Sequence, residues 1–123
     1  MIRKGLLSLS VSIGMAIPTV AAGSGSVLWA GASKGRPEAG KPIYMESCQH
    51  CHGPLGDGKS EMAQYLTPPP ADLTAKKTQS KKDGQLRKVI IEGVPGTAMS
   101  AFGEAFDDQQ MADLLAYIRS RKR

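Results

Sequence analysis

Two cysteines and two histidines lie within five consecutive residues of this chain, in the segment Cys48-Gln49-His50-Cys51-His52. On a helical turn, positions 48, 51 and 52 are three and four residues apart, so their side chains project from one face. Two thiols can add across the two vinyl groups of a porphyrin, and an imidazole on the same turn can bind its iron. The spacing therefore predicts one covalently attached haem c, with Cys48 and Cys51 as anchors and His52 as an axial iron ligand.

Two other chemistries use closely spaced cysteines and are alternatives to haem attachment. A zinc site normally has four ligands, and four candidates crowded into five residues cannot all reach one tetrahedral metal without severe strain. A redox-active dithiol is expected to open a helix after an apolar β-strand, and no such strand is predicted before Cys48. Dithiol chemistry is the stronger of these two alternatives. His50 lies on the other face of the turn and is predicted to be solvated.

The first residues have the pattern of an export segment. Arg3 and Lys4 are followed by an uncharged stretch through residue 33, whose apolar part ends in the small-residue run Val20-Ala21-Ala22. We therefore predict that residues 1–22 are a bacterial export signal peptide. The alternative is an uncleaved membrane anchor reaching to about residue 30, because the uncharged stretch is long enough to cross a bilayer.

The segment after the export region is rich in Gly and Ser, and residues 23–36 are predicted to form a flexible lead. Residues 37–123 are then expected to fold as one domain. Either fate of the N-terminal segment places this domain outside the cytoplasm. We therefore predict a periplasmic protein, either soluble or anchored to the outer face of the inner membrane, with membrane association only if the segment is uncleaved.

The chain has a formal net charge of +5, and its basic residues form two stretches. The first contains Lys76, Lys77, Lys81, Lys82, Arg87 and Lys88, and the second contains Arg119, Arg121, Lys122 and Arg123. Such stretches are often solvated surface or favourable cations at a helix C-terminus. Their functional interpretation is steering toward redox partner proteins with acidic docking surfaces. Nucleic-acid binding is not expected, because no aromatic residues are interleaved with the basic ones.

The hydrophobic pattern predicts an all-α fold with three main helices and long loops. The first helix is expected at about Glu38 to Cys51, the second at about 82–92, and the third after an N-cap at Asp107. Residues 53–80 are predicted to be mostly loop, with a short helical segment near 61–66. No segment shows the alternation of a β-strand. Loops of this length in a small domain are expected to wrap a ligand.

The second axial position on iron is predicted to be filled by a methionine, since the other histidine is tied to the attachment turn. Met99 is our candidate because it lies in a loop of small and turn-forming residues, which can deliver a thioether without helix geometry interfering. Met45 and Met111 lie in predicted helices, where core packing explains them. Met62 stays open as an alternative ligand on spacing alone.

Four segments together resemble a class I monohaem cytochrome c: 48–53, 69–74, 93–99 and 116–119. The resemblance covers about residues 38–121. It implies a small helix-only cytochrome c fold around one covalently bound haem, in which the first and last helices cross beside the haem. It also implies that four residues meet at that crossing, namely Gly40, Tyr44, Leu114 and Tyr117.

The resemblance further implies that a proline carbonyl orients the His52 ring through its second nitrogen. Pro70 is the predicted partner, with Pro69 as the alternative. One position departs from the family, because Ser100 follows Met99 where proline is common. We expect this serine to loosen the ligand loop.

With both axial positions occupied by protein, iron would have no open site for a substrate, so we expect electron transfer rather than enzyme activity. The predicted role is a carrier between exported or membrane-bound redox enzymes. One alternative is a tethered haem subunit of a larger oxidoreductase. Another is a haem enzyme or gas sensor with a labile distal ligand.

Overall fold

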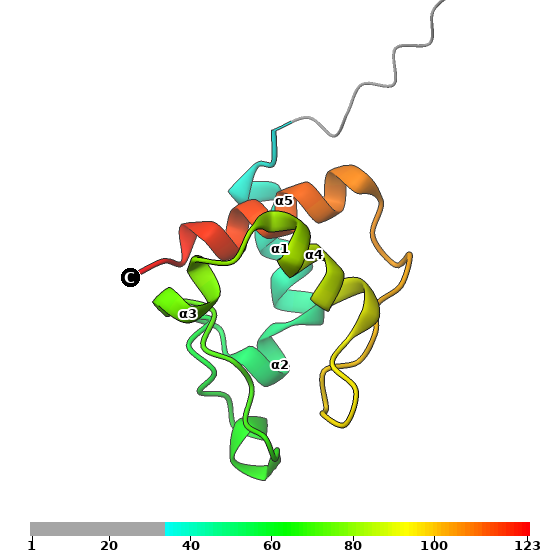
Figure 1. Ribbon diagram of the computed structural model, residues 1–123. Helices are drawn as coiled ribbons and strands as arrows, with labels where there is room; N and C mark the ends of the chain where they lie inside the picture. The colour runs from blue at the N-terminus through cyan, green and yellow to red at the C-terminus, as the bar shows by residue number, and fades with distance from the viewer. Residues whose placement is uncertain (1–33) are drawn as a thin grey trace, which may run out of the picture.

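A computed structural model describes residues 34–123, and this part of the chain contains helices and no strand. The elements are α1 (Pro37–Ser47), α2 (Gln49–His52), a 3₁₀ helix η1 (Met62–Tyr65), α3 (Lys76–Gln79), α4 (Asp83–Glu92) and α5 (Asp108–Ser120) (Figure 1). The all-α fold with three main helices is therefore confirmed. The predicted signal peptide and most of the predicted lead lie outside the described residues.

Helices α1 and α5 cross at the centre of the molecule, as the resemblance implied (Figure 1). Gly40 allows the crossing, since a Cβ atom on it would lie 1.9 Å from the carbonyl oxygen of Asp113. One turn later, the ring of Tyr44 packs against that of Tyr117, with centroids 5.1 Å apart and planes inclined by 50°. Tyr44 and Leu114 are fully buried. The contact between these two helices is thus the centre of the core.

Helix α5 begins as its sequence predicts. The Asp107 carboxylate accepts a hydrogen bond from the amide of Gln110, and the Gln110 side chain accepts one from the amide of Asp107. This reciprocal cap satisfies two amides that would otherwise lack partners. The apolar face of α5 is buried, with Met111, Leu114, Leu115 and Ile118 in the core cluster.

Two ion pairs attach the first half of α4 to the two ends of α5. Asp83, at the start of α4, pairs with Arg119 at 2.8 Å, near the end of α5, and Arg87, in the middle of α4, pairs with Asp108 at the start of α5. Leu86 and Ile90 face the core. Helix α4 is thereby fixed against α5.

The first helix is not continuous through the attachment turn, so the prediction of one helix to Cys51 is wrong. The amide of Cys48 donates to the carbonyl of Tyr44 at 2.8 Å, which completes α1. The carbonyl of Cys48 then accepts hydrogen bonds from the amides of Cys51 and His52, at 3.2 and 2.9 Å, which starts α2. The chain bends at Cys48, where φ is −120° and ψ is −35°. The turn that relates 48, 51 and 52 is nevertheless retained.

Most of residues 53–80 is irregular, as predicted, and the expected short helical segment is η1. The sequence did not predict α3. This helix is held by side chains that reach outside it, since Thr78 is buried and its hydroxyl donates to the carbonyl of Asp72 at 2.8 Å. Among the described residues, no helix is both long enough and apolar enough to cross a bilayer.

Candidate haem-attachment site

The two predicted anchor residues are free thiols at the junction of α1 and α2. Cys48 and Cys51 are both partly exposed, and Cys48 packs against the core cluster. Burial, together with Cys51 beside it, raises the pKa of the Cys48 thiol to about 11. A redox-active pair depends on a lowered thiol pKa, so this environment argues against dithiol chemistry. Two thiols on one turn are the groups that can add to vinyl substituents.

His52 is oriented by the backbone of a distant loop. Its Nδ1 atom lies 2.9 Å from the carbonyl oxygen of Ala71. Because a carbonyl can only accept, Nδ1 carries the hydrogen and donates it. The lone pair is then on Nε2, which is the nitrogen left to bind a metal. Fixing a ligand ring through its second nitrogen is the usual way in which proteins orient a histidine toward a metal.

The prediction that Pro70 supplies this carbonyl is wrong, and so is the alternative Pro69. The Pro70 carbonyl faces Gly58 instead, since a Cβ atom on Gly58 would lie 2.8 Å from its oxygen. Successive carbonyls of a non-helical segment point in different directions, so the register decides which one reaches His52. Here the register places Ala71 at that point.

Three hydrogen bonds fix the loop that follows His52. The buried Tyr44 hydroxyl donates to the carbonyl of Gly53 at 2.6 Å. The amide of Gly58 donates to the carbonyl of His52 itself, at 2.8 Å. The amide of Leu73 donates to the carbonyl of Gly56 at 2.7 Å, which joins this loop to the segment that contains Ala71. His52 is therefore held from α1 and from two loops at once.

Met99 lies in the connection between α4 and α5, on the border of the core cluster. Its carbonyl accepts from the amide of Val94 at 3.0 Å, and its amide donates to the Thr97 hydroxyl at 3.1 Å. Gly93 makes this tight return feasible, because its φ is +68° and a Cβ on it would lie 2.7 Å from the Met99 carbonyl oxygen. The alternative ligand Met62 is 47% exposed on η1.

The Met99 loop begins where α4 ends, and its far end is attached to the last turn of α4. The amide of Phe102 donates to the carbonyl of Ile90 at 3.0 Å, and that of Gly103 to the carbonyl of Ile91 at 2.9 Å. These bonds satisfy carbonyls that the end of a helix leaves without partners. They close the loop independently of Ser100, the position at which the sequence departs from the resemblance.

The residues at this site fit a porphyrin better than a bare metal ion. Cys48, Leu73, Met99 and Phe102 are partly buried and border the same apolar cluster. Such a border suits a large apolar ligand. Within residues 34–123, no three His, Cys, Asp or Glu side chains converge on a common point, so a zinc site is not supported there.

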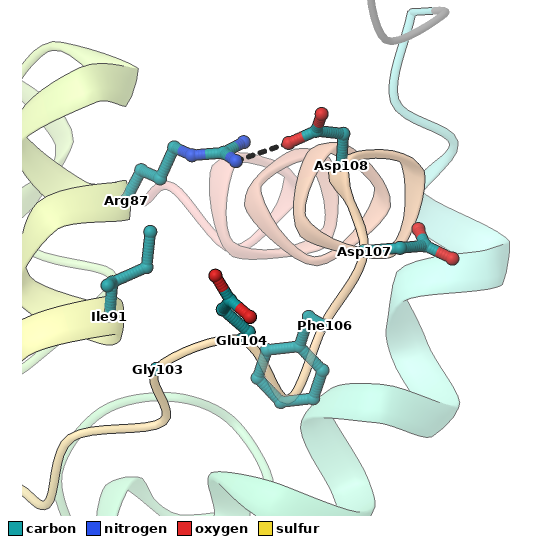
Figure 2. Close-up of a pocket in the computed structure, with 7 residues that line it drawn as sticks. All are labelled: Arg87, Ile91, Gly103, Glu104, Phe106, Asp107 and Asp108. Carbon is teal, nitrogen blue, oxygen red and sulfur yellow. Dashed lines mark hydrogen bonds and ion pairs between the residues drawn. The ribbon is translucent and has the colours of Figure 1, made fainter.

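Two hollows of about 470 Å³ each lie on the α4–α5 side of the molecule, away from the attachment turn. Figure 2 shows one of them, with Arg87 of α4 and Asp108 of α5 paired across it and Phe106 at its wall. The other lies among Lys34, Gly84 and Ala116. Neither hollow is lined by the two thiols or by His52.

Comparison with known proteins agrees with this geometry. A family model described as Cytochrome c matches residues 37–122. The dihydro-heme d1 dehydrogenase of Pseudomonas aeruginosa is 32% identical to this chain over 82 residues, which is 64% of the chain and 14% of the dehydrogenase. The chain thus spans about one seventh of that relative's length.

Solved structures share the fold. One chain of the reducing HAO-like protein complex of Kuenenia stuttgartiensis aligns with a TM-score of 0.62 at 25% identity, over 72% of this chain and 44% of that one. A c-type cytochrome, KustC0563, aligns with a TM-score of 0.59 over 68% of this chain and 98% of that one. Its identity of 22% makes this a likeness of fold alone. With the family model matching most of the described residues, the chain belongs to the cytochrome c family.

Proposed function

We propose that this protein transfers single electrons through one covalent c-type haem, anchored by Cys48 and Cys51 and ligated by His52 and Met99. The main observation in support is the hydrogen bond from His52 Nδ1 to the carbonyl of Ala71. It leaves Nε2 as the free nitrogen on the same turn that bears both thiols. Cytochrome c domains bind haem and serve in electron transfer, and this is the family to which the chain belongs.

The bound haem would supply a one-electron iron couple, and the protein's contribution is to hold the ligands still. His52 is fixed through its ring nitrogen and through the loop behind it. Met99 lies in a loop closed at both ends on α4. Neither ligand needs to move when the charge on iron changes, so little rearrangement opposes electron exchange. A thioether ligand and an apolar border both favour the reduced state and raise the potential.

On this proposal the protein is not an enzyme, since His52 and Met99 leave no position for a substrate. The role we favour is a carrier between exported or membrane-bound redox enzymes. Because c-type cytochromes are typically exported, we also propose that the domain works in the bacterial periplasm. Mass spectrometry of the purified protein would give the haem mass and the true N-terminus in one measurement.

The structure joins the two basic stretches into one surface. Arg119 of α5 donates to the carbonyls of Gln79 and Lys81, so the end of α5 lies against the α3–α4 connection. We call this surface the basic end; its exposed basic residues are Lys76, Lys77, Lys81, Lys82, Lys122 and Arg123, and Asp83, paired with Arg119, is an exposed acidic residue beside them. The acidic residues Glu104, Asp107 and Asp108 lie at the start of α5, at the opposite end of that helix. This separation of charge supports docking to an acidic partner surface.

A tethered haem subunit or domain of a larger oxidoreductase is the second candidate. The chain matches only a small part of the dihydro-heme d1 dehydrogenase and less than half of a chain in the HAO-like complex. Cytochrome c domains thus occur within larger redox proteins. Gel filtration of the protein from its native source separates the two roles: a carrier elutes as a small monomer, whereas a subunit co-elutes with an oxidoreductase.

Two methionine variants test the axial ligation. Met99→Ala is expected to keep the covalent haem, to lower the potential on the order of 0.1 V, and to let the reduced protein bind carbon monoxide. This shift is a modest fraction of the range of about 0.8 V that axial ligands control. Met62→Ala is the matched control, because Met62 is half exposed on η1 and should leave both readouts unchanged.

If Met62→Ala lowered the potential and allowed carbon monoxide binding while Met99→Ala did not, Met62 would be the ligand. Carbon monoxide binding by the unaltered reduced protein would refute electron transfer with two fixed ligands and would support a gas sensor or haem enzyme.

A further inference from the structure

The residues that follow α5 contact both loops that position His52. We call residues 121–123 the strap. The Nε atom of Arg121 donates to the carbonyl of Leu55 at 3.4 Å. The Arg123 guanidinium lies 3.5 Å from an Asp57 carboxylate oxygen, and the Arg123 amide donates to the carbonyl of Thr74 at 3.3 Å. One short segment thereby reaches the loop after His52 and the segment after Ala71.

The carboxylate that receives Arg123 is itself part of the loop behind the ligand. The Asp57 side chain is only 11% exposed, and its other oxygen accepts from the amide of Lys59 at 3.1 Å. It lies one residue before Gly58, whose amide binds the carbonyl of His52. The Arg123–Asp57 pair therefore fixes the loop close to the ligand.

Gln79 makes a second tie between α5 and the segment that orients His52. Its side-chain amide donates to the carbonyl of Leu73 at 2.6 Å and to the carbonyl of Ile118, in α5, at 2.9 Å. Leu73 and Thr74 are thus both attached to the end of α5, two and three residues after Ala71. The Ala71 carbonyl itself binds His52 of α2, and the segment that carries it is attached to α5 through Leu73 and Thr74.

We propose that Gln79 and Arg123 are positioning residues for the hydrogen bond between His52 and Ala71, and through it for the redox equilibrium of the haem. This inference rests on the proposed ligation of iron by His52. A strong hydrogen bond from Nδ1 makes the imidazole a more basic ligand, which favours ferric iron. When the ties are removed, the Ala71 carbonyl is held less firmly and the bond weakens. The reduced state is then stabilised relative to the oxidised state.

The test is potentiometric titration of the holoprotein. Gln79→Leu keeps the side-chain bulk without its donors, and should raise the reduced-to-oxidised ratio at fixed ambient potential about tenfold, or about 59 mV for one electron. Arg123→Ala should raise this ratio about threefold, and Arg123→Lys should return it most of the way to the value of the unaltered protein. Arg123 is 62% exposed, so its variants keep the core and decide the matter if Gln79→Leu does not accumulate.

Lys122→Ala is the matched control for charge. It removes one positive charge beside Arg123, and charge loss alone favours ferric iron and lowers the ratio. Arg123→Ala is expected to change the ratio in the opposite direction, which a purely electrostatic role cannot produce. If Gln79→Leu leaves the ratio unchanged, or Arg123→Ala shifts it as Lys122→Ala does, the positioning role is wrong. A protein without covalent haem or without a one-electron wave would instead refute the proposed function.

Discussion

Replacing Gly40 by alanine tests whether the α1–α5 crossing determines the stability of this domain. A Cβ atom at position 40 would lie 1.9 Å from the carbonyl oxygen of Asp113, 2.4 Å from its carbonyl carbon and 2.9 Å from the amide nitrogen of Leu114. All three atoms belong to the backbone of α5, so no side chain can rotate away. The two helices must separate, or one of them must slide.

The cost follows from the distance that has to be recovered. Ordinary contacts between non-bonded heavy atoms are about 3.5–4.0 Å, so the helices must move apart by more than an ångström. That movement opens the tightest part of the core, where Tyr44 packs on Tyr117 and Leu114 is fully buried. Overpacking usually costs about 1–3 kcal/mol, and here we expect about 3 kcal/mol or more because backbone blocks the relief. Domains have only about 5–15 kcal/mol in total.

The assay is urea unfolding of the holoprotein, followed by far-ultraviolet circular dichroism. Gly84→Ala is the control, because nothing lies within 4 Å of a Cβ atom at that position in α4. Alanine there should be neutral or stabilising by up to about 1 kcal/mol, since it reduces the freedom of the unfolded chain. The same substitution thus has opposite expected effects at two helical glycines. If Gly40→Ala unfolds at the same urea concentration as Gly84→Ala, the crossing is not as close as described.

Three further predictions concern polar groups. Tyr44→Phe removes the donor to the buried carbonyl of Gly53 and should lower the unfolding free energy by about 1–3 kcal/mol in urea titration; no change would contradict the bond. Hydrogen bonds to the Asp113 carboxylate, first from the Arg36 amide and then from the Gln109 side chain, hold the pKa of Asp113 below its usual value. Its contribution is therefore complete above the unfolded pKa of about 3.9 and lost as pH falls through the folded value, so the stability gap to Asp113→Asn should close in acid. Lys81→Glu should weaken binding of polyglutamate severalfold in calorimetry at low salt, with the difference gone near 0.5 M salt.

Features set by neighbouring residues could be predicted from the sequence. The Asp107 cap, the buried face of α5 and the extent of α4 follow from local hydrogen bonding and helical periodicity. The short helical segment near residue 61 was also found, as η1. Each of these depends on contacts within a few residues, so both partners of each contact lie in the same short stretch of sequence. The attachment turn belongs to the same class, because its three residues are neighbours.

Features set by distant partners were missed. The acceptor for His52 depends on a register that the bond from the Leu73 amide to the Gly56 carbonyl fixes across the loop. Helix α3 depends on Gln79, which reaches a carbonyl 39 residues away in α5. The resemblance implied a proline carbonyl at residues 69–70, and nothing local distinguishes it from the next carbonyl along the chain. These errors all lie where tertiary hydrogen bonds, rather than propensity, choose the conformation.

The two proposed ligands are held by different parts of the fold, and not equally firmly. His52 is tied to α1 through Gly53, to the Ala71 segment through its ring, and to α5 through the strap. The hydrogen bonds that join the Met99 loop to the rest of the described fold go to the end of α4, and the residues on both sides of Met99 are exposed. Segments with few buried contacts open at the lowest free energy. It follows that the methionine side is the part of this site that loosens first, while the histidine side stays fixed until the α1–α5 crossing itself gives way.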